Sequence, residues 1–190
     1  LIDTFKSIRP DIRNIPNGIE LGDYPFVLRR NPRPHLIWLR AFHRIYCPTL
    51  PVQVLHELQK KYPEAKLTMI GPDKGDGTLQ EAKALAFDLG LNDAVTFIEA
   101  IPKNKVGKYL NQGEIFLNTT LLESFGVAVL EAAACGLCIV STNVGELPLL
   151  WENGTDALLV PPNDATAMAK AVESILANPD FASQLSASAR

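Results

Sequence analysis

Short apolar runs alternate along this chain with longer stretches that have helical spacing, and this alternation limits the possible folds more than any other feature. The runs are brief and predominantly apolar, which is typical of strands buried on both faces of a parallel sheet. They cover residues 12–15, 35–39, 66–70, 94–98, 114–118, 137–142 and 157–160. The sequence therefore predicts a parallel sheet.

The stretches between these runs carry apolar residues at intervals of three or four, as one face of an amphipathic helix requires. The stripes comprise Leu50, Val54, Leu58 and Tyr62; Leu79, Ala82, Ala86 and Leu89; and Met168, Val172 and Ile175. Asp164 is the predicted N-cap of the last helix, and Asn178-Pro179 is its predicted end. Repeated strand–helix–strand units with short connections predict an α/β, Rossmann-like, doubly wound parallel sheet flanked by helices.

The size and charge of the chain limit the number of domains and the classes of partner that we expect. Its 190 residues, 47% of them hydrophobic, are ample for one core, so we expect a single domain over residues 1–190. The net charge is −3 with both signs scattered, which leaves no basic stripe for nucleic acid. No apolar run reaches the length of a bilayer span, and LIDTFKSIRP lacks the apolar core of a signal peptide. We therefore expect a soluble, cytoplasmic chain with no nucleic-acid partner and no membrane segment.

Cys135 and Cys138 form a C-x-x-C pair, which is compatible with redox chemistry, half a zinc site or two structural thiols. The sequence offers no second Cys or His pair to complete a zinc site, and the flanking residues are apolar. An odd total of three cysteines suits a reducing compartment. We expect buried structural thiols and no metal site.

Ligands of doubly wound sheets bind outside the carboxyl ends of the strands, so the residues after each predicted strand are candidate site residues. They are Asn17 and Gly18, Arg40, Gly71, the segment 119–126 and the segment 142–145. For Asn17 and the glycines taken singly, we favour the simpler interpretation that they are turn residues of the kind any such sheet needs. Arg40 and the segment 119–126 add charge to this edge of the sheet.

The stretch LESFGVAVLEAAACG places Glu123 and Glu131 eight positions apart, with Gly126 between them. A helix that begins at a glycine lets a phosphate approach backbone N–H groups. Glu131, inside that helix, would then accept hydrogen bonds from sugar hydroxyls, and Glu123 would lie in the loop ahead of it. The alternatives are a solvated helix face for Glu131 and compensation of the helix dipole for Glu123.

The segment E-SFGVAVL-E, followed by AAACGLCIVSTNVGELP, resembles the E-x(7)-E signature of the retaining glycosyltransferases of family four. IPNGIE, LTMIGP and ENGTDALLVPPND are similar to three further motifs of that family, in the same order. These are GT-B enzymes, built from two Rossmann-like domains. The resemblance covers nearly the whole chain and implies the carboxyl-terminal, nucleotide-sugar-binding domain.

The resemblance implies a nucleoside-diphosphate sugar as donor substrate, with no cofactor and no metal. Glu123 would contact the donor sugar, Glu131 the ribose hydroxyls, and Arg40 the diphosphate. The backbone N–H groups of Phe125, Gly126 and Val127 would face the sugar and the diphosphate. The remaining candidate donor-binding residues are Ser124, Asn17, Gly18, Gly71 and Arg44.

Four positions depart from the family pattern. Ile45 stands where the family has a lysine. Arg44 and His43 are candidate replacements, but we favour a surface arginine and a loop histidine for these two residues. Leu39 and Glu99 replace glycines, and Leu149 replaces a glutamate.

The resemblance also implies a missing amino-terminal domain with the acceptor site, so we expect this chain to be a fragment that binds donor and does not transfer sugar alone. Any membrane contact would be peripheral and through that domain. A catalytically degenerate nucleotide-binding or interaction module and a GT-B epimerase remain alternatives, and uridine, guanosine and adenosine donors all remain open.

Overall fold

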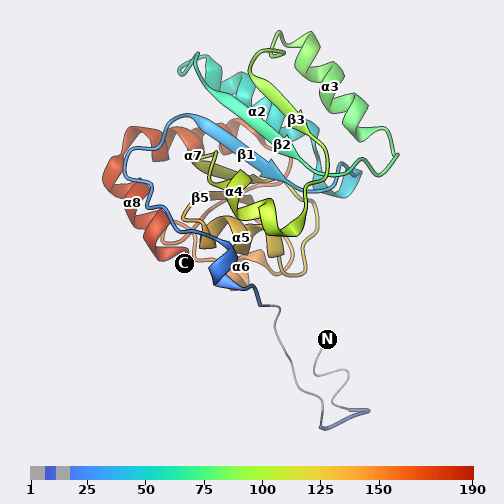
Figure 1. Cartoon of the computed structure of the whole chain (residues 1–190), viewed down its shortest axis with the longest axis vertical. Helices are drawn as coiled ribbons and strands as arrows, with labels where there is room; N and C mark the ends of the chain where they lie inside the picture. The colour runs from blue at the N-terminus through green and yellow to red at the C-terminus, as the bar shows by residue number, and fades with distance from the viewer. Residues whose placement is uncertain (1–6, 12–17) are drawn as a thin grey trace.

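The computed structural model describes residues 7–11 and 18–190, and its centre is a six-stranded sheet (Figure 1). All strand pairs are parallel, in the order β3-β2-β1-β4-β5-β6. The strands are β1 His35–Leu39, β2 Lys66–Ile70, β3 Val95–Ile98, β4 Ile115–Asn118, β5 Cys138–Thr142 and β6 Leu158–Val160. The predicted Rossmann-like parallel sheet is confirmed, while the run predicted over 12–15 lies outside the described residues.

The sheet is buried on both faces, and successive residues of a strand supply two separate cores. In β1, Leu36 and Trp38 belong to one core and Ile37 to the other, and all three are fully buried. This alternation follows from the period of two of an extended strand. It explains why the strands are apolar runs without a polar face.

Helices cover both faces of the sheet (Figure 1). The core that contains Leu36 and Trp38 also takes up α2 Thr49–Gln59, α3 Thr78–Asp88, α7 Ala165–Ala177 and α8 Pro179–Ser188. The opposite core takes up α4 Val106–Leu110, α5 Val127–Ala134 and α6 Leu147–Leu150. Short 3₁₀ turns are η1 Leu21–Asp23, η2 Arg44–Tyr46 and η3 Lys103–Lys105. In the part of the chain that the structure describes, no helix has both the length and the apolar character needed to cross a bilayer.

The predicted cap of α7 is confirmed, since the Asp164 carboxylate accepts the backbone N–H of Ala167 at 2.8 Å. The predicted end of this helix is also confirmed, because α7 ends at Ala177. Asn178 and Pro179 have a second role, however. The Asn178 side chain accepts the N–H of Phe181 at 3.1 Å, and Pro179 begins α8. The same dipeptide ends one helix and starts the next.

The segment before β1 is fastened across the end of α5. The N–H of Val27 donates to the carbonyl of Cys135 at 3.1 Å, and the N–H of Arg29 donates to the Ser186 hydroxyl at 3.0 Å. The Arg29 guanidinium, which is 4% exposed, pairs with Glu114 at 3.2 Å. These contacts hold the neighbouring Tyr24 against the α5 side of the sheet.

The C-x-x-C pair consists of two free, buried thiols, as predicted. Cys135 follows the last turn of α5 and Cys138 begins β5, with their sulfurs near the carbonyls of Gly107 and Ala182 at 3.7 and 3.5 Å. Burial raises the pKa of Cys135 to about 11 and that of Cys138 to about 12. Both thiols stay protonated at neutral pH and act as packing groups.

Ellman's reagent should therefore titrate one thiol rapidly in the folded protein at pH 8, because only the thiolate reacts. At that pH, pKa values near 11 and 12 leave roughly 0.1% and 0.01% thiolate at the two buried sites. Cys47, which is only partly buried, supplies the fast phase, and all three thiols react in denaturant. The matched control, Cys47→Ser, should abolish the fast phase. Two or more fast thiols in the folded protein would contradict this account.

Candidate functional site

The sheet has its topological switch point between β1 and β4. The chain leaves β1 toward β2 and β3, and then returns to place β4 on the other side of β1. Loops after neighbouring strands diverge at such a point and leave a crevice at their carboxyl ends. A cavity of about 370 Å³ lies there, lined by the ends of β1 and β2, by the segment that follows β3 and by the first turns of α5.

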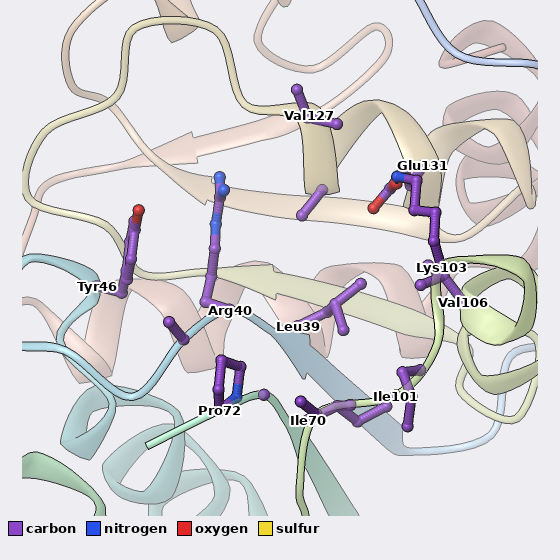
Figure 2. Close-up of a pocket in the computed structure, with 14 residues that line it drawn as sticks. Leu39, Arg40, Tyr46, Ile70, Pro72, Ile101, Lys103, Val106, Val127 and Glu131 are labelled. Carbon is purple, nitrogen blue, oxygen red and sulfur yellow. The ribbon is translucent and has the colours of Figure 1, made fainter. Parts of the chain in front are cut away.

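Figure 2 shows the charges around this cavity. Arg40 and Lys103 stand on opposite sides of it, with Leu39 and Ile70 between them. Glu131 reaches in from α5 on the side of Lys103. The cavity thus has an apolar floor, a cation on each side and one carboxylate.

Arg40 is the first residue after β1, and its backbone N–H donates to the carbonyl of Ile70 at 3.1 Å. Its side chain is 13% exposed and pairs with Glu123. The guanidinium carbon lies 5.2 Å from the centre of the Tyr46 ring, a favourable cation–π distance. Its Nε is buried without a hydrogen-bond partner in the described part of the chain. Arg40 therefore keeps a donor to spare at the switch point.

The position of Tyr46 depends on a short chain of hydrogen bonds from the core. The indole N–H of Trp38 donates to the Thr119 hydroxyl at 2.9 Å, and that hydroxyl donates to the carbonyl of Tyr46 at 2.7 Å. The ends of β1 and β4 thereby fix the turn that supports Arg40.

Gly71 lines the same cavity, directly after β2. A Cβ at this position would overlap the carbonyl oxygen of Arg40. The predicted glycine is therefore required by the close approach of two loop backbones.

Glu123 is 11% exposed and lies between several hydrogen-bond donors. One of its oxygens accepts Arg40, and the other accepts the backbone N–H groups of Ser124 and Phe125 at 3.2 and 3.4 Å. The N–H of Phe125, which was expected to face a diphosphate, is thus directed at the protein's own carboxylate, and so is the N–H of Ser124. Ser124 and Phe125 do not line the cavity, whereas Val127, the first residue of α5, does. Gly126 is the N-cap of α5, with a φ of 83°.

Glu131 is 4% exposed, so the solvated-face interpretation is wrong. It sits in α5, in which every other residue is apolar. One oxygen, Oε1, accepts the hydroxyl of Tyr24 at 2.7 Å and also pairs with Lys103. A buried carboxylate needs such partners, because burying a charge without them is costly.

Tyr24 and Lys103 were missed by sequence reasoning. Lys103 follows β3, so the rule that selected Arg40 could have selected it as well. Tyr24 lies 107 positions from Glu131 and precedes the first described strand, and no local pattern indicates that contact.

Several predicted residues lie away from the cavity. Arg44 is 68% exposed and pairs with Glu81 at 3.4 Å, and His43 lies 4.0 Å from Asp76, so neither supplies a second cation to the cavity. The carbonyl of Ile45 accepts the N–H of Leu121 at 2.8 Å, so Ile45 contributes a backbone hydrogen bond to this region.

Four other positions were singled out in the sequence. Gly18 is exposed and does not line the cavity, and Asn17 lies outside the described residues. Glu99 lines an adjacent cavity of about 450 Å³, which shares Gly71, Pro72 and Ala100 with the first, and Leu149 is 78% exposed. Over residues 7–11 and 18–190, no group of three or more His, Cys, Asp and Glu side chains is placed to hold a metal ion.

Most of the chain, including this site, is similar to one known protein family. The family described as "Glycosyl transferases group 1" matches residues 33–190. The chain belongs to this family. The matched region contains Arg40, Lys103, Glu123 and Glu131, which are all the charged residues described around the switch point.

A phosphatidylinositol N-acetylglucosaminyltransferase subunit from Arabidopsis thaliana is a relative of this glycosyl transferase group 1 chain, 34% identical over 84% of it. The chain spans only 35% of the length of that relative. The Francisella tularensis LpcC carboxyl-terminal domain, from the same family, superposes with a TM-score of 0.80 at 17% identity, over 90% of this chain and 94% of that one. The structure of Anabaena HepE in complex with UDP-glucose superposes with a TM-score of 0.82 at 16% identity, over 91% of this chain and 50% of HepE. These two structures establish the fold, that of a GT-B carboxyl-terminal domain.

Proposed function

We propose that this chain is the donor-binding part of a retaining glycosyltransferase, which transfers a sugar from a nucleoside-diphosphate sugar to an acceptor. One observation carries the proposal. Arg40 and the N–H groups of Ser124 and Phe125 converge on a single carboxylate at the switch point, which is the set of donors that a diphosphate requires. Glu131 borders the adjoining cavity, where a ribose would lie.

This arrangement suits glycosyl transfer. The bond to the leaving diphosphate breaks through an oxocarbenium-like transition state, and negative charge grows on the phosphate oxygens. Arg40, held in place by Ile70 and Tyr46, supplies fixed positive charge at that point. The start of α5 adds the positive end of a helix dipole. These groups support release of the diphosphate without a metal ion, and bound donor would free Glu123 to contact the sugar hydroxyls.

Retention of the anomeric configuration is proposed from the resemblance of E-SFGVAVL-E to the family four signature. The acceptor site is proposed to lie on an amino-terminal GT-B domain that faces this one across the cleft. The free thiols favour action in a reducing compartment such as the cytoplasm, with any membrane contact made through the other domain.

The test is a calorimetric titration of this chain with UDP, GDP and ADP and with their glucose conjugates. We expect one nucleotide to bind, and Glu131→Ala to abolish that binding. The matched control is Glu64→Ala, which removes an exposed carboxylate away from the cavity and should bind like the wild type. If both the folded chain and the complete enzyme bind none of these nucleotides, the proposed function is wrong.

A nucleotide-binding module without transferase activity is the second candidate. Two observations favour it: Ile45 lacks the expected positive charge, and Glu123 already occupies Arg40 and the loop N–H groups. Such a module would bind a nucleotide in the titration and show no sugar transfer in the complete protein.

A further inference from the structure

The carboxylate of Glu131 is held from one side only. Within residues 7–11 and 18–190, both of its recorded hydrogen bonds end on Oε1, one from the Tyr24 hydroxyl and one from Lys103. The side chain lines the cavity, and an ionised carboxylate offers about four acceptor positions on its two oxygens. The second oxygen, Oε2, is thereby left to a ligand.

The two partners of Oε1 differ in rigidity. Tyr24 is 2% exposed and packs in the same core as α4 and α5. A Cβ at Gly107, in α4, would overlap the carbonyl of Asp23 and lie 3.3 Å from the Cα of Tyr24, so the backbones are in close contact. Burial raises the pKa of Tyr24 above its ordinary value, so its hydroxyl keeps its proton and donates. Tyr24 therefore provides a fixed direction for the hydrogen bond.

Lys103 is 66% exposed and opens η3 at the rim of the cavity. Its ammonium lies 5.9 Å from the centre of the Tyr24 ring, so the cation, the ring and the carboxylate form one cluster. A solvated lysine supplies charge without a fixed geometry. Lys103 therefore compensates the buried negative charge, while Tyr24 sets its orientation.

We propose that Tyr24 and Lys103 are positioning residues that hold Oε1 of Glu131 and turn Oε2 toward the ribose diol of the bound nucleotide. This inference rests on the proposed function, because it assigns selectivity to the same site. A carboxylate fixed in this way accepts hydrogen bonds from the vicinal hydroxyls of a ribonucleotide. A deoxy analogue would cover this carboxylate oxygen without supplying those hydrogen bonds, and sites of this kind reject such analogues strongly.

The experiment compares the Kd values of UDP, GDP and ADP with those of their 2′,3′-dideoxy counterparts, for the wild type and four variants. We expect the wild type to bind one of the ribonucleotides about 10- to 100-fold more tightly than its dideoxy counterpart. Tyr24→Phe removes only the hydroxyl, Lys103→Met removes only the charge, and Glu131→Gln removes the charge of the acceptor. Each of these three variants should reduce the preference for the ribonucleotide over its dideoxy counterpart to less than about 3-fold, mainly by lowering the affinity for the ribonucleotide. Tyr109→Phe, which alters a tyrosine packed against the same core, should keep the full preference.

The outcomes distinguish the proposed function from the positioning role. If neither the folded wild-type chain nor the complete enzyme binds any of the three ribonucleotides, the proposed function fails and this inference fails with it. If Glu131→Gln abolishes the preference while Tyr24→Phe and Lys103→Met retain it, the function stands and the positioning role is overturned. Equal weakening of the ribo and dideoxy ligands in Tyr24→Phe would indicate a structural role and would also overturn the inference. Lys103→Met changes an exposed side chain, so the test remains decisive if Tyr24→Phe does not fold.

Discussion

Arg40→Ala should lower kcat for sugar transfer by the complete enzyme about 100- to 1,000-fold, while the Kd for the donor rises less than about 10-fold. The asymmetry follows from where the charge develops. Arg40 faces the switch point with a buried Nε that has no hydrogen-bond partner among the described residues, and its stabilising effect grows as the diphosphate leaves. Steady-state kinetics and a calorimetric titration measure the two quantities separately.

Arg44→Ala is the matched control for this prediction. It makes the same chemical change four residues along the chain, in a side chain that is 68% exposed and pairs with Glu81. We expect its kcat and Kd to stay within about 2-fold of the wild type. Comparable losses of binding and turnover in Arg40→Ala would contradict a catalytic role. Binding without measurable transfer by the wild type would instead support the nucleotide-binding module.

Glu123→Gln should move binding and catalysis in opposite directions. In the free protein the Glu123 carboxylate occupies Arg40 and the N–H groups of Ser124 and Phe125, so an incoming diphosphate has to displace it. A neutral amide competes less well, because hydrogen bonds to charged groups are about twice as strong. We expect nucleoside diphosphate affinity to rise about 3- to 10-fold. Transfer should fall by about 100-fold or more, since the amide does not replace the carboxylate at the sugar hydroxyls.

The control for this variant is Glu146→Gln. Glu146 lies beside the same loop, and its N–H donates to the carbonyl of Glu123 at 3.0 Å, but its side chain is exposed. Neither affinity nor transfer should change. Weaker binding of nucleoside diphosphates by Glu123→Gln would show that the carboxylate is not a competitor for the anion site.

The strands and the sheet were predictable because burial on both faces leaves a strong local signal. All six described strands were predicted to within one residue at their starts, since each is an apolar run between helical stripes. The same regularity led to Arg40 and Gly71, which follow directly after predicted strands. The helix after Gly126 was predicted from its glycine and small residues, and α5 begins at Val127.

The partners within the site were less predictable, because they depend on contacts between distant parts of the chain. The burial of Glu131 could have been inferred from α5, whose remaining residues are all apolar and leave no solvated face. The Tyr24 contact could not, since nothing near Tyr24 in sequence indicates its partner. Arg44 was selected by its proximity to the missing lysine, and the turn η2 directs it to the surface instead.

The fastening of residues 24–29 across α5 has a practical consequence for anyone who trims this protein. The family match begins at residue 33, and a version cut there would retain every strand of the described sheet and every charged residue around the cavity. It would nevertheless lose Tyr24, which donates to Glu131, and Arg29, which pairs with Glu114. The residues that support the proposed nucleotide site therefore begin upstream of the region of family similarity, and expression should start before residue 24.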